Sequence, residues 1–259
     1  MFDTPIKLFY SRRIGKRLYT GKEVSIIGGV KYTGSYQRLK FGFLSAYTDE
    51  ASTEPKGLYS VGRIKLGVLE NSDIGVLYSE ARNEDNTQGV LGIDGTFRTR
   101  EIQIMSQVAK ERGYAELLKL DWNARKFIVQ SKYENYDENF NIDRIGYAPW
   151  KGRTNYSLGV GPRFFNIGPF YSLSTGIGRG AIKDVGEPDW GYWISTWFYS
   201  TFKNNCGLSS DFYKGRSYEI DRWYEYYQAS VSFWSDNSKP VVLSDNGEHR
   251  VRSSNFILL

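Results

Sequence analysis

The stretch "RLKFGFLSAYT", residues 38–48, alternates apolar and polar side chains with a period of two. Leu39, Phe41 and Phe43 fall on one face, whereas Arg38 and Lys40 fall on the other. This alternation is typical of a β-strand with one apolar face. The stretch is longer than the usual soluble strand of about 5–6 residues. It suits a tilted strand that crosses a membrane.

The same alternation recurs along the chain, for example at 74–78 and 118–122, and predicts about 14 strands of roughly 9–13 residues. Short turns, such as Gly34-Ser35, alternate with longer polar segments such as 48–57 and 135–154. A membrane barrel keeps its short turns at one end and its long loops at the other. We therefore expect an all-β fold, an antiparallel up-and-down transmembrane β-barrel of about 14 or more strands, complete or not, in one domain over 1–259.

The composition of the chain argues against several kinds of functional site and partner. The 259 residues carry a net charge of +5, spread along the chain, with one histidine, His249, and one cysteine, Cys206. Internal disulfides and cysteine-based zinc sites are excluded, and a histidine-dependent triad would have to use His249 alone. The dispersed charge argues against a nucleic-acid partner. The sequence indicates no cofactor and no catalytic residue.

The polar faces of the expected strands would line a wet barrel interior, or the solvent face of a soluble sheet if the barrel prediction fails. Eight charged residues at the lumen or rim are candidates for ligand binding: Arg12, Arg13, Arg38, Lys40, Arg63, Lys65, Lys119 and Asp121. Aromatic residues at strand ends would form interfacial girdles, namely Trp122, Trp190, Trp193, Trp223 and Tyr224.

The segment "DENFNID", residues 137–143, spaces four oxygen-bearing side chains as the opening of a calcium-binding loop does. These side chains are Asp137, Asn139, Asn141 and Asp143. Its sixth position is Ile142 where glycine belongs, and its twelfth is Ala148 where a glutamate belongs. We therefore expect a polar loop, with a calcium site as the weaker alternative.

The motif "LFYSRRIG", residues 8–15, resembles the start of the C-terminal domain in a bacterial outer-membrane family. Segments similar to others in that family follow: "IIGGVKYTG" at 26–34, "GFLSAYTDE" at 42–50 and "YENYDENFNIDRIGY" at 133–147. The resemblance is dense over 8–150 and architectural beyond. Members of this family carry a signal peptide, then a carbohydrate-binding family 9-like domain, then a β-barrel domain of unknown function.

The resemblance implies a barrel in the outer membrane of a Gram-negative bacterium, with the lipid bilayer as partner and a link to glycan binding or uptake. It also implies that this chain is a fragment, since the family's first two segments are absent. We expect the motif at 8–15 to be the first strand of the barrel, with one of Arg12 and Arg13 in the lumen, one at the rim, and acidic partners for both. A membrane-associated hydrolase and a soluble β-rich binding module are the alternatives; enzymatic activity is not expected.

Overall fold

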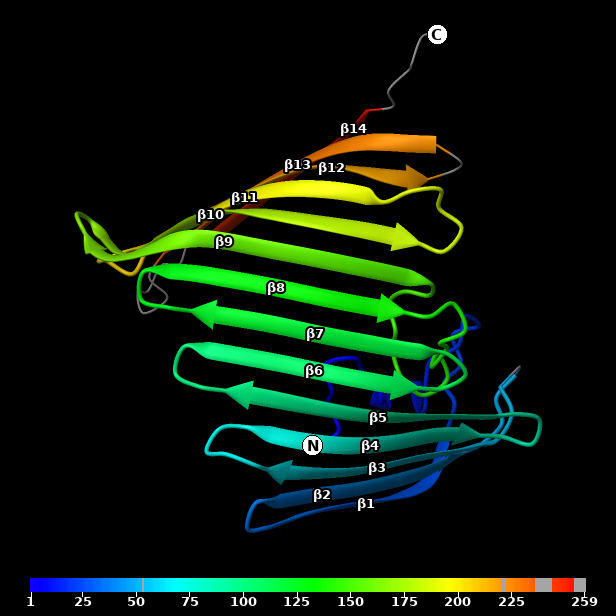
Figure 1. Cartoon of the computed structure of the whole chain (residues 1–259). Helices are drawn as coiled ribbons and strands as arrows, with labels where there is room; N and C mark the ends of the chain where they lie inside the picture. Colours follow the sequence, from blue (N-terminus) through cyan, green and yellow to red (C-terminus); the bar gives the residue numbers. More distant parts are fainter. Residues whose placement is uncertain (53, 220–221, 236–243, 254–259) are drawn as a thin grey trace. The chain divides into compact units, whose positions relative to one another are not determined.

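The computed structural model describes residues 1–52, 54–219, 222–235 and 244–253. Within them the chain forms one short 3-10 helix, Ser11–Arg13, and fourteen strands, whose order in the sheet is their order in the sequence (Figure 1). The strands are β1 (Ile26–Tyr36), β2 (Leu39–Thr48), β3 (Gly57–Gly67), β4 (Asp73–Arg82), β5 (Thr87–Arg98), β6 (Ile102–Lys110), β7 (Tyr114–Asn123), β8 (Phe127–Tyr136), β9 (Arg153–Ile167), β10 (Phe170–Asp184), β11 (Gly191–Phe202), β12 (Gly207–Glu219), β13 (Arg222–Trp234) and β14 (Ser244–Ser253).

Consecutive strands pair antiparallel from β1 to β6 and from β10 to β14. The predicted all-β, up-and-down antiparallel fold is therefore confirmed. In the described ranges, none of the helical structure is long and apolar enough to cross a membrane.

The chain divides into two compact units. Unit 1 consists of Met1–Lys119 and Glu134–Arg153, and unit 2 of Leu120–Tyr133 and Thr154–Leu259. Unit 1 contains β1–β6 together with the N-terminal residues and the 137–152 loop, and unit 2 contains β9–β14. The prediction of one domain over 1–259 stays a prediction.

Connection lengths differ between the two ends of the strands. In unit 1, one end carries the connections 37–38, 68–72 and 99–101, whereas the other carries 49–56, 83–86, 111–113 and 137–152. In unit 2, 168–169 and 203–206 lie at one end and 185–190 at the other. We call the second end of each unit the long-loop end. The predicted turn at Gly34-Ser35 is wrong, because these residues lie within β1 and the chain turns at Gln37, whose φ is 51°.

The two faces of the unit 1 sheet have opposite surroundings. On one, the apolar face, large hydrophobic side chains are exposed, including Ile64 at 57% and Ile93 at 60%. On the other, the covered face, the strands pack against the N-terminal residues and the 137–152 loop. Their shared core is formed by Ile6, Leu8, Tyr59, Val61, Leu77, Ala81, Val90, Ala109, Ala115, Leu117, Tyr136, Phe140, Ile142 and Ile145.

A soluble sandwich would pack its apolar stripes against one another. In unit 1 the apolar stripes of β3–β5 are instead the exposed ones. An apolar outward face opposite a filled interior is the arrangement of a membrane barrel strand.

The motif at 8–15 does not form the first strand, so that prediction is wrong. Leu8 is fully buried on the covered face, Ser11–Arg13 form the 3-10 helix, and the first strand begins at Ile26. Alternating burial is found instead in the residues that lead into the motif, where Thr4, Ile6 and Leu8 are all buried. These buried side chains meet the face of the sheet, and the segment does not extend the sheet's edge.

Candidate functional site

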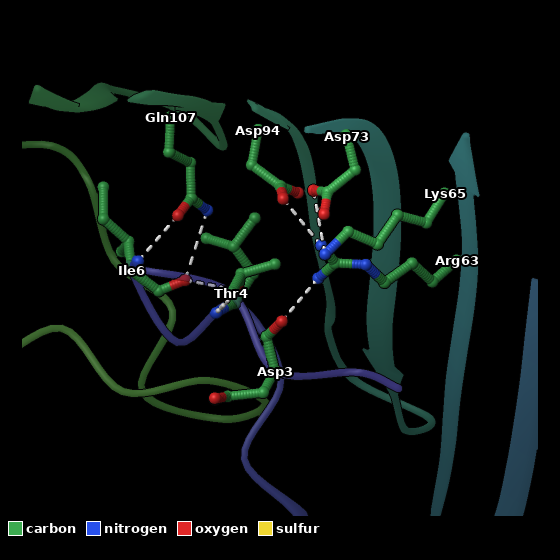
Figure 2. Close-up of polar contacts among 9 residues, drawn as sticks. Asp3, Thr4, Ile6, Arg63, Lys65, Asp73, Asp94 and Gln107 are labelled. Atoms are coloured by element: carbon green, nitrogen blue, oxygen red, sulfur yellow. Dashed lines mark hydrogen bonds and ion pairs between the residues drawn. The ribbon is translucent and has the colours of Figure 1, made fainter. Parts of the chain in front are cut away.

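Arg63, on β3, is the centre of a buried polar cluster on the covered face (Figure 2). Its guanidinium donates to the Asp94 carboxylate at 2.6 Å and to the backbone oxygen of Asp3 at 2.8 Å. The Arg63 side chain is 1% exposed and that of Asp94 is 5% exposed. The ion pair therefore fastens β3 to β5, and its second hydrogen bond fastens the N-terminal segment, residues 1–14, to both.

Lys65 and Asp73 form a neighbouring ion pair on the same face, with Nζ 2.9 Å from Oδ1 (Figure 2). The two pairs are packed side by side around Gly75. A Cβ at Gly75 would lie 3.2 Å from Arg63 Nη2 and 3.3 Å from Asp94 Oδ2. Glycine at this position leaves room for the buried charges.

Gln107, on β6, binds the N-terminal segment as a neighbouring strand would. Its Oε1 accepts from the Ile6 backbone N–H at 2.6 Å, and its Nε2 donates to the Ile6 carbonyl at 3.2 Å. The Thr4 hydroxyl also donates to that carbonyl, at 2.5 Å. On β4, the Ser79 hydroxyl donates to the Leu8 carbonyl at 2.7 Å. Side chains thus satisfy backbone groups that burial would otherwise leave unpaired.

The 137–152 loop holds the other side of the N-terminal segment. Lys7 and Tyr147 form an antiparallel bridge, in which the Tyr147 N–H donates to the Lys7 carbonyl at 2.8 Å. The Tyr10 N–H donates to the Ile145 carbonyl, also at 2.8 Å. The N-terminal segment and the loop therefore pack as one plug against the covered face. Side chains of the plug and of the strands therefore fill this part of the covered face.

The structure places the other predicted lumen or rim residues of unit 1 away from this cluster. Arg13 donates to the carbonyl of Gly146 at 3.2 Å, so its expected acidic partner is replaced by a backbone oxygen. Arg12 is exposed on the short helix. Arg38 lies in the turn before β2 and Lys40 near the start of that strand, and both are exposed.

The last two candidates lie on β7. Lys119 ends the first segment of unit 1 and Asp121 lies in unit 2, where its carboxylate accepts from Gln130 at 3.5 Å. Sequence reasoning chose Arg63 and Lys65 but missed their partners Asp73 and Asp94. The alternation of side chains along each strand could have identified them, because both aspartates fall on the polar face of their own strands.

The oxygens of the "DENFNID" segment serve the loop's own backbone. Asp137 accepts from the Asn139 N–H at 2.8 Å and Asn141 from the Asp143 N–H at 3.0 Å. The Asp143 carboxylate pairs with Lys151 at 2.9 Å. In the described residues no group of three or more His, Cys, Asp or Glu side chains is arranged to hold a metal ion. A polar cavity of about 280 Å³ lies beside this segment, and Glu138, Asn139 and Asn141 contribute to its lining.

Unit 2 has a face rich in glycine and tryptophan, which we call the glycine-rich face. The Trp197 ring, from β11, lies over Gly176. A Cβ added at Gly159 would lie 3.4 Å from the same ring. Trp193 lies over Gly180 in the same way. The indole rings take the space of the absent side chains.

Polar side chains share the glycine-rich face with these rings. Asp211 is the direct cross-strand neighbour of Trp197. One row along, Ser195 is opposite Tyr213, which is opposite Gln228. The face thus combines flat aromatic rings with hydrogen-bonding groups. The placement of Trp193 here means that its predicted role in an interfacial girdle is wrong.

The opposite face of unit 2 is apolar and exposed, with Ile177, Ile194, Phe212 and Val231 on it. Aromatic rings cluster at its long-loop end. The Tyr156 ring lies 5.0 Å from Tyr133 and 5.6 Å from Trp190. Trp190 and Trp223 lie at the end of the strands where a girdle was expected. Tyr224 follows Trp223 directly in the strand, so its side chain falls on the opposite, glycine-rich face.

Together the up-and-down antiparallel order, the apolar outward stripes and the filled or polar opposite faces define a membrane β-barrel fold. The crystal structure of Acinetobacter baumannii OccAB3 is similar to this chain, with a TM-score of 0.55 and 10% sequence identity over 96% of this chain and 91% of that one. At this identity the likeness establishes the fold alone. No protein-family model matches the chain, and no curated protein matches its sequence.

Proposed function

We propose that this protein is an outer-membrane β-barrel that binds glycans at the cell surface. The barrel class follows from the fold and from its likeness to OccAB3. The proposed location follows from the class, because antiparallel β-barrels are the structures that cross outer membranes with strands. The glycan ligand and the Gram-negative host do not follow from the barrel class and are proposed in addition to it.

The observation that carries the glycan proposal is the glycine-rich face of unit 2. The Trp197 ring lies over Gly176, and the carboxylate-bearing Asp211 is its cross-strand neighbour. The electron-rich face of an aromatic ring attracts the weakly positive C–H groups of a sugar ring. Carboxylate, amide and hydroxyl groups then bind the sugar hydroxyls. Gln228 and Ser195 supply such groups in the next row.

The resemblance of residues 8–150 to a family with a carbohydrate-binding domain supports the same ligand class, and we propose membership of that family. The hydrolase alternative gains less support. On the covered face of unit 1, Asp94 and Asp73 are each paired with a cation. The Arg63–Asp94 pair joins β3 to β5 and the Lys65–Asp73 pair joins β3 to β4, and these strand-to-strand contacts favour a structural role for both carboxylates over catalysis.

The test is oligosaccharide binding to purified, folded protein in detergent, measured by calorimetry. The probes are neutral hexasaccharides of α-1,4-glucose, β-1,4-glucose and β-1,4-N-acetylglucosamine. At least one should bind, and both Trp197→Ala and the isosteric Asp211→Asn should weaken it about tenfold, the loss expected for one buried polar contact. The control is Tyr171→Ala, which removes an exposed ring from the apolar face. Equal binding by the two variants and the wild type would contradict the proposal.

A further inference from the structure

The apolar face of unit 2 changes character along its strands. On β10 the outward side chains run Tyr171, Leu173, Thr175 and Ile177, and then become basic at Arg179. On β12 they change from Phe212 to Lys214 and Arg216. In both strands the change falls toward the long-loop end. An apolar band therefore ends at a basic border.

Two cations of the basic border, Arg179 and Lys214, lie in one cross-strand row. Arg179 is opposite Ile194, Ile194 is opposite Lys214, and Lys214 is opposite Tyr227. Arg179 and Lys214 are two strands apart, so their backbones are roughly 10 Å apart. Both side chains are exposed. Two long cationic side chains at this separation can reach one anion placed over Ile194.

Aromatic rings frame this row. The Lys214 Nζ lies 5.2 Å from the Tyr227 ring centroid, and the Arg179 guanidinium carbon lies 6.0 Å from that of Tyr192. A surface hollow of about 360 Å³ lies here, and its lining includes Arg179, Ile194, Lys214 and Glu225. The floor of the hollow is thus apolar at Ile194 and cationic on either side.

Arg216, one row further toward the loop, is already engaged. Its guanidinium donates to the Asp189 carboxylate at 2.9 Å and to the Trp190 carbonyl at 3.0 Å, and stacks on Trp223 at 4.4 Å. The Trp190 backbone N–H and then Arg216 hold the pKa of the Asp189 carboxyl below its usual value. The 185–190 loop is therefore fastened beside the row. Arg216 also lines the hollow, but its guanidinium is held by these contacts with the loop. Arg179 and Lys214 are the cations on either side of Ile194, and Lys214 is hydrogen-bonded to the Tyr227 side chain.

We propose that Arg179 and Lys214 bind the phosphate of a membrane lipid head group at the border of the apolar face of unit 2. The site rests on the proposed placement of the barrel in a membrane. Cations are costly in the lipid-facing middle of a barrel strand and tolerated near its interface. A lipid explains both halves of the surface, because its acyl chains cover the band below while its phosphate meets the cations. Glu225 beside Lys214 favours a phosphate that is held mainly from the Arg179 side.

The test compares ligands that differ in one group, using folded protein in neutral detergent. Dioleoyl phosphatidic acid carries the phosphate, dioleoylglycerol has the same chains without it, and inorganic phosphate is the anion alone. Phosphatidic acid should bind at least about tenfold more tightly than either, the effect of one charge-assisted contact. Equal binding of dioleoylglycerol would overturn the role of the cations. Equal binding of inorganic phosphate would overturn the lipid as the ligand.

The variants isolate the two cations. Arg179→Gln/Lys214→Gln should abolish the preference for phosphatidic acid. The control, Arg100→Gln/Arg125→Gln, removes the same charge from exposed turns and should keep that preference. Heat-dependent migration on SDS gels checks folding of every variant, and Arg179→Gln alone replaces the double variant if that one does not fold. An undiminished preference in the folded double variant, or in folded Arg179→Gln where it replaces the double variant, contradicts the site. A wild-type protein that shows no heat-dependent migration would contradict the barrel itself.

Discussion

Replacing Gln107 by leucine should release the N-terminal segment from the covered face of unit 1. The change keeps the buried volume but removes both hydrogen bonds to the Ile6 backbone. The Ile6 N–H loses its partner, which costs about 1–3 kcal/mol, and the second bond contributes about 1 kcal/mol more. The Thr4 hydroxyl still serves the Ile6 carbonyl. Local opening should therefore become easier by about 2–4 kcal/mol.

Hydrogen exchange measured by mass spectrometry tests this value, because amides in peptides covering 1–14 exchange through local opening. Their exchange should accelerate about 30- to 700-fold, since each 1.4 kcal/mol is a factor of ten. Peptides from β3–β5 should change far less. Gln103→Leu is the matched control, because Gln103 is on the same strand and face and binds the Arg98 side chain. Unchanged exchange at 1–14 in folded Gln107→Leu, or equal acceleration in the control, would refute this account of the plug.

Two further predictions concern the same face. Arg63→Met should destabilise the folded protein by about 3–5 kcal/mol in urea titrations, because it leaves the Asp94 carboxylate buried without its cation. The double variant Arg63→Met/Asp94→Leu should recover most of this loss. A double variant as unstable as the single one would argue against a buried ion pair. Gly92→Ala should cost about 1–3 kcal/mol, because its added Cβ would collide with Leu8. Gly62→Ala, whose Cβ meets nothing within 4 Å, should change stability by about 0.5 kcal/mol or less, and equal effects of the two substitutions would contradict the docking of Leu8.

The period-two pattern predicted the strands well because it is a local property of the chain. Ile64, Ile74 and Ile93 share one exposed face for the same reason that their polar neighbours share the other. The pattern predicted the positions of the turns less accurately. The turn was predicted at Gly34-Ser35, where glycine adopts a positive φ at no steric cost, but the chain reverses through a positive φ at Gln37.

The plug could not be predicted in this way because its contacts are distant in sequence. Ile6 and Gln107 are 101 residues apart, and Arg63 and Asp94 are 31 apart. Alternation in the N-terminal segment is correct but ambiguous. A strand that pairs with side chains on the face of a sheet has the same period as one that pairs with the sheet's edge.

The glycine-rich face shows a similar limit. The rings of Trp197 and Trp193, on β11, lie over Gly176 and Gly180 of β10. The sequence gives no register between β10 and β11, so the pairing of each ring with its glycine was out of reach. Trp193 was predicted as a girdle residue from its place near a strand end, but its ring lies over Gly180 on the glycine-rich face.

The central claim is that the apolar faces of this fold meet lipid in an outer membrane. The most direct measurement joins the chain to a signal peptide, expresses it in a Gram-negative host, and compares unheated and boiled outer-membrane fractions on an SDS gel. A folded membrane barrel resists the detergent until boiled, so we expect the protein in the outer-membrane fraction with a migration that changes on heating. Recovery as a folded, soluble periplasmic protein with no change in migration would contradict the claim.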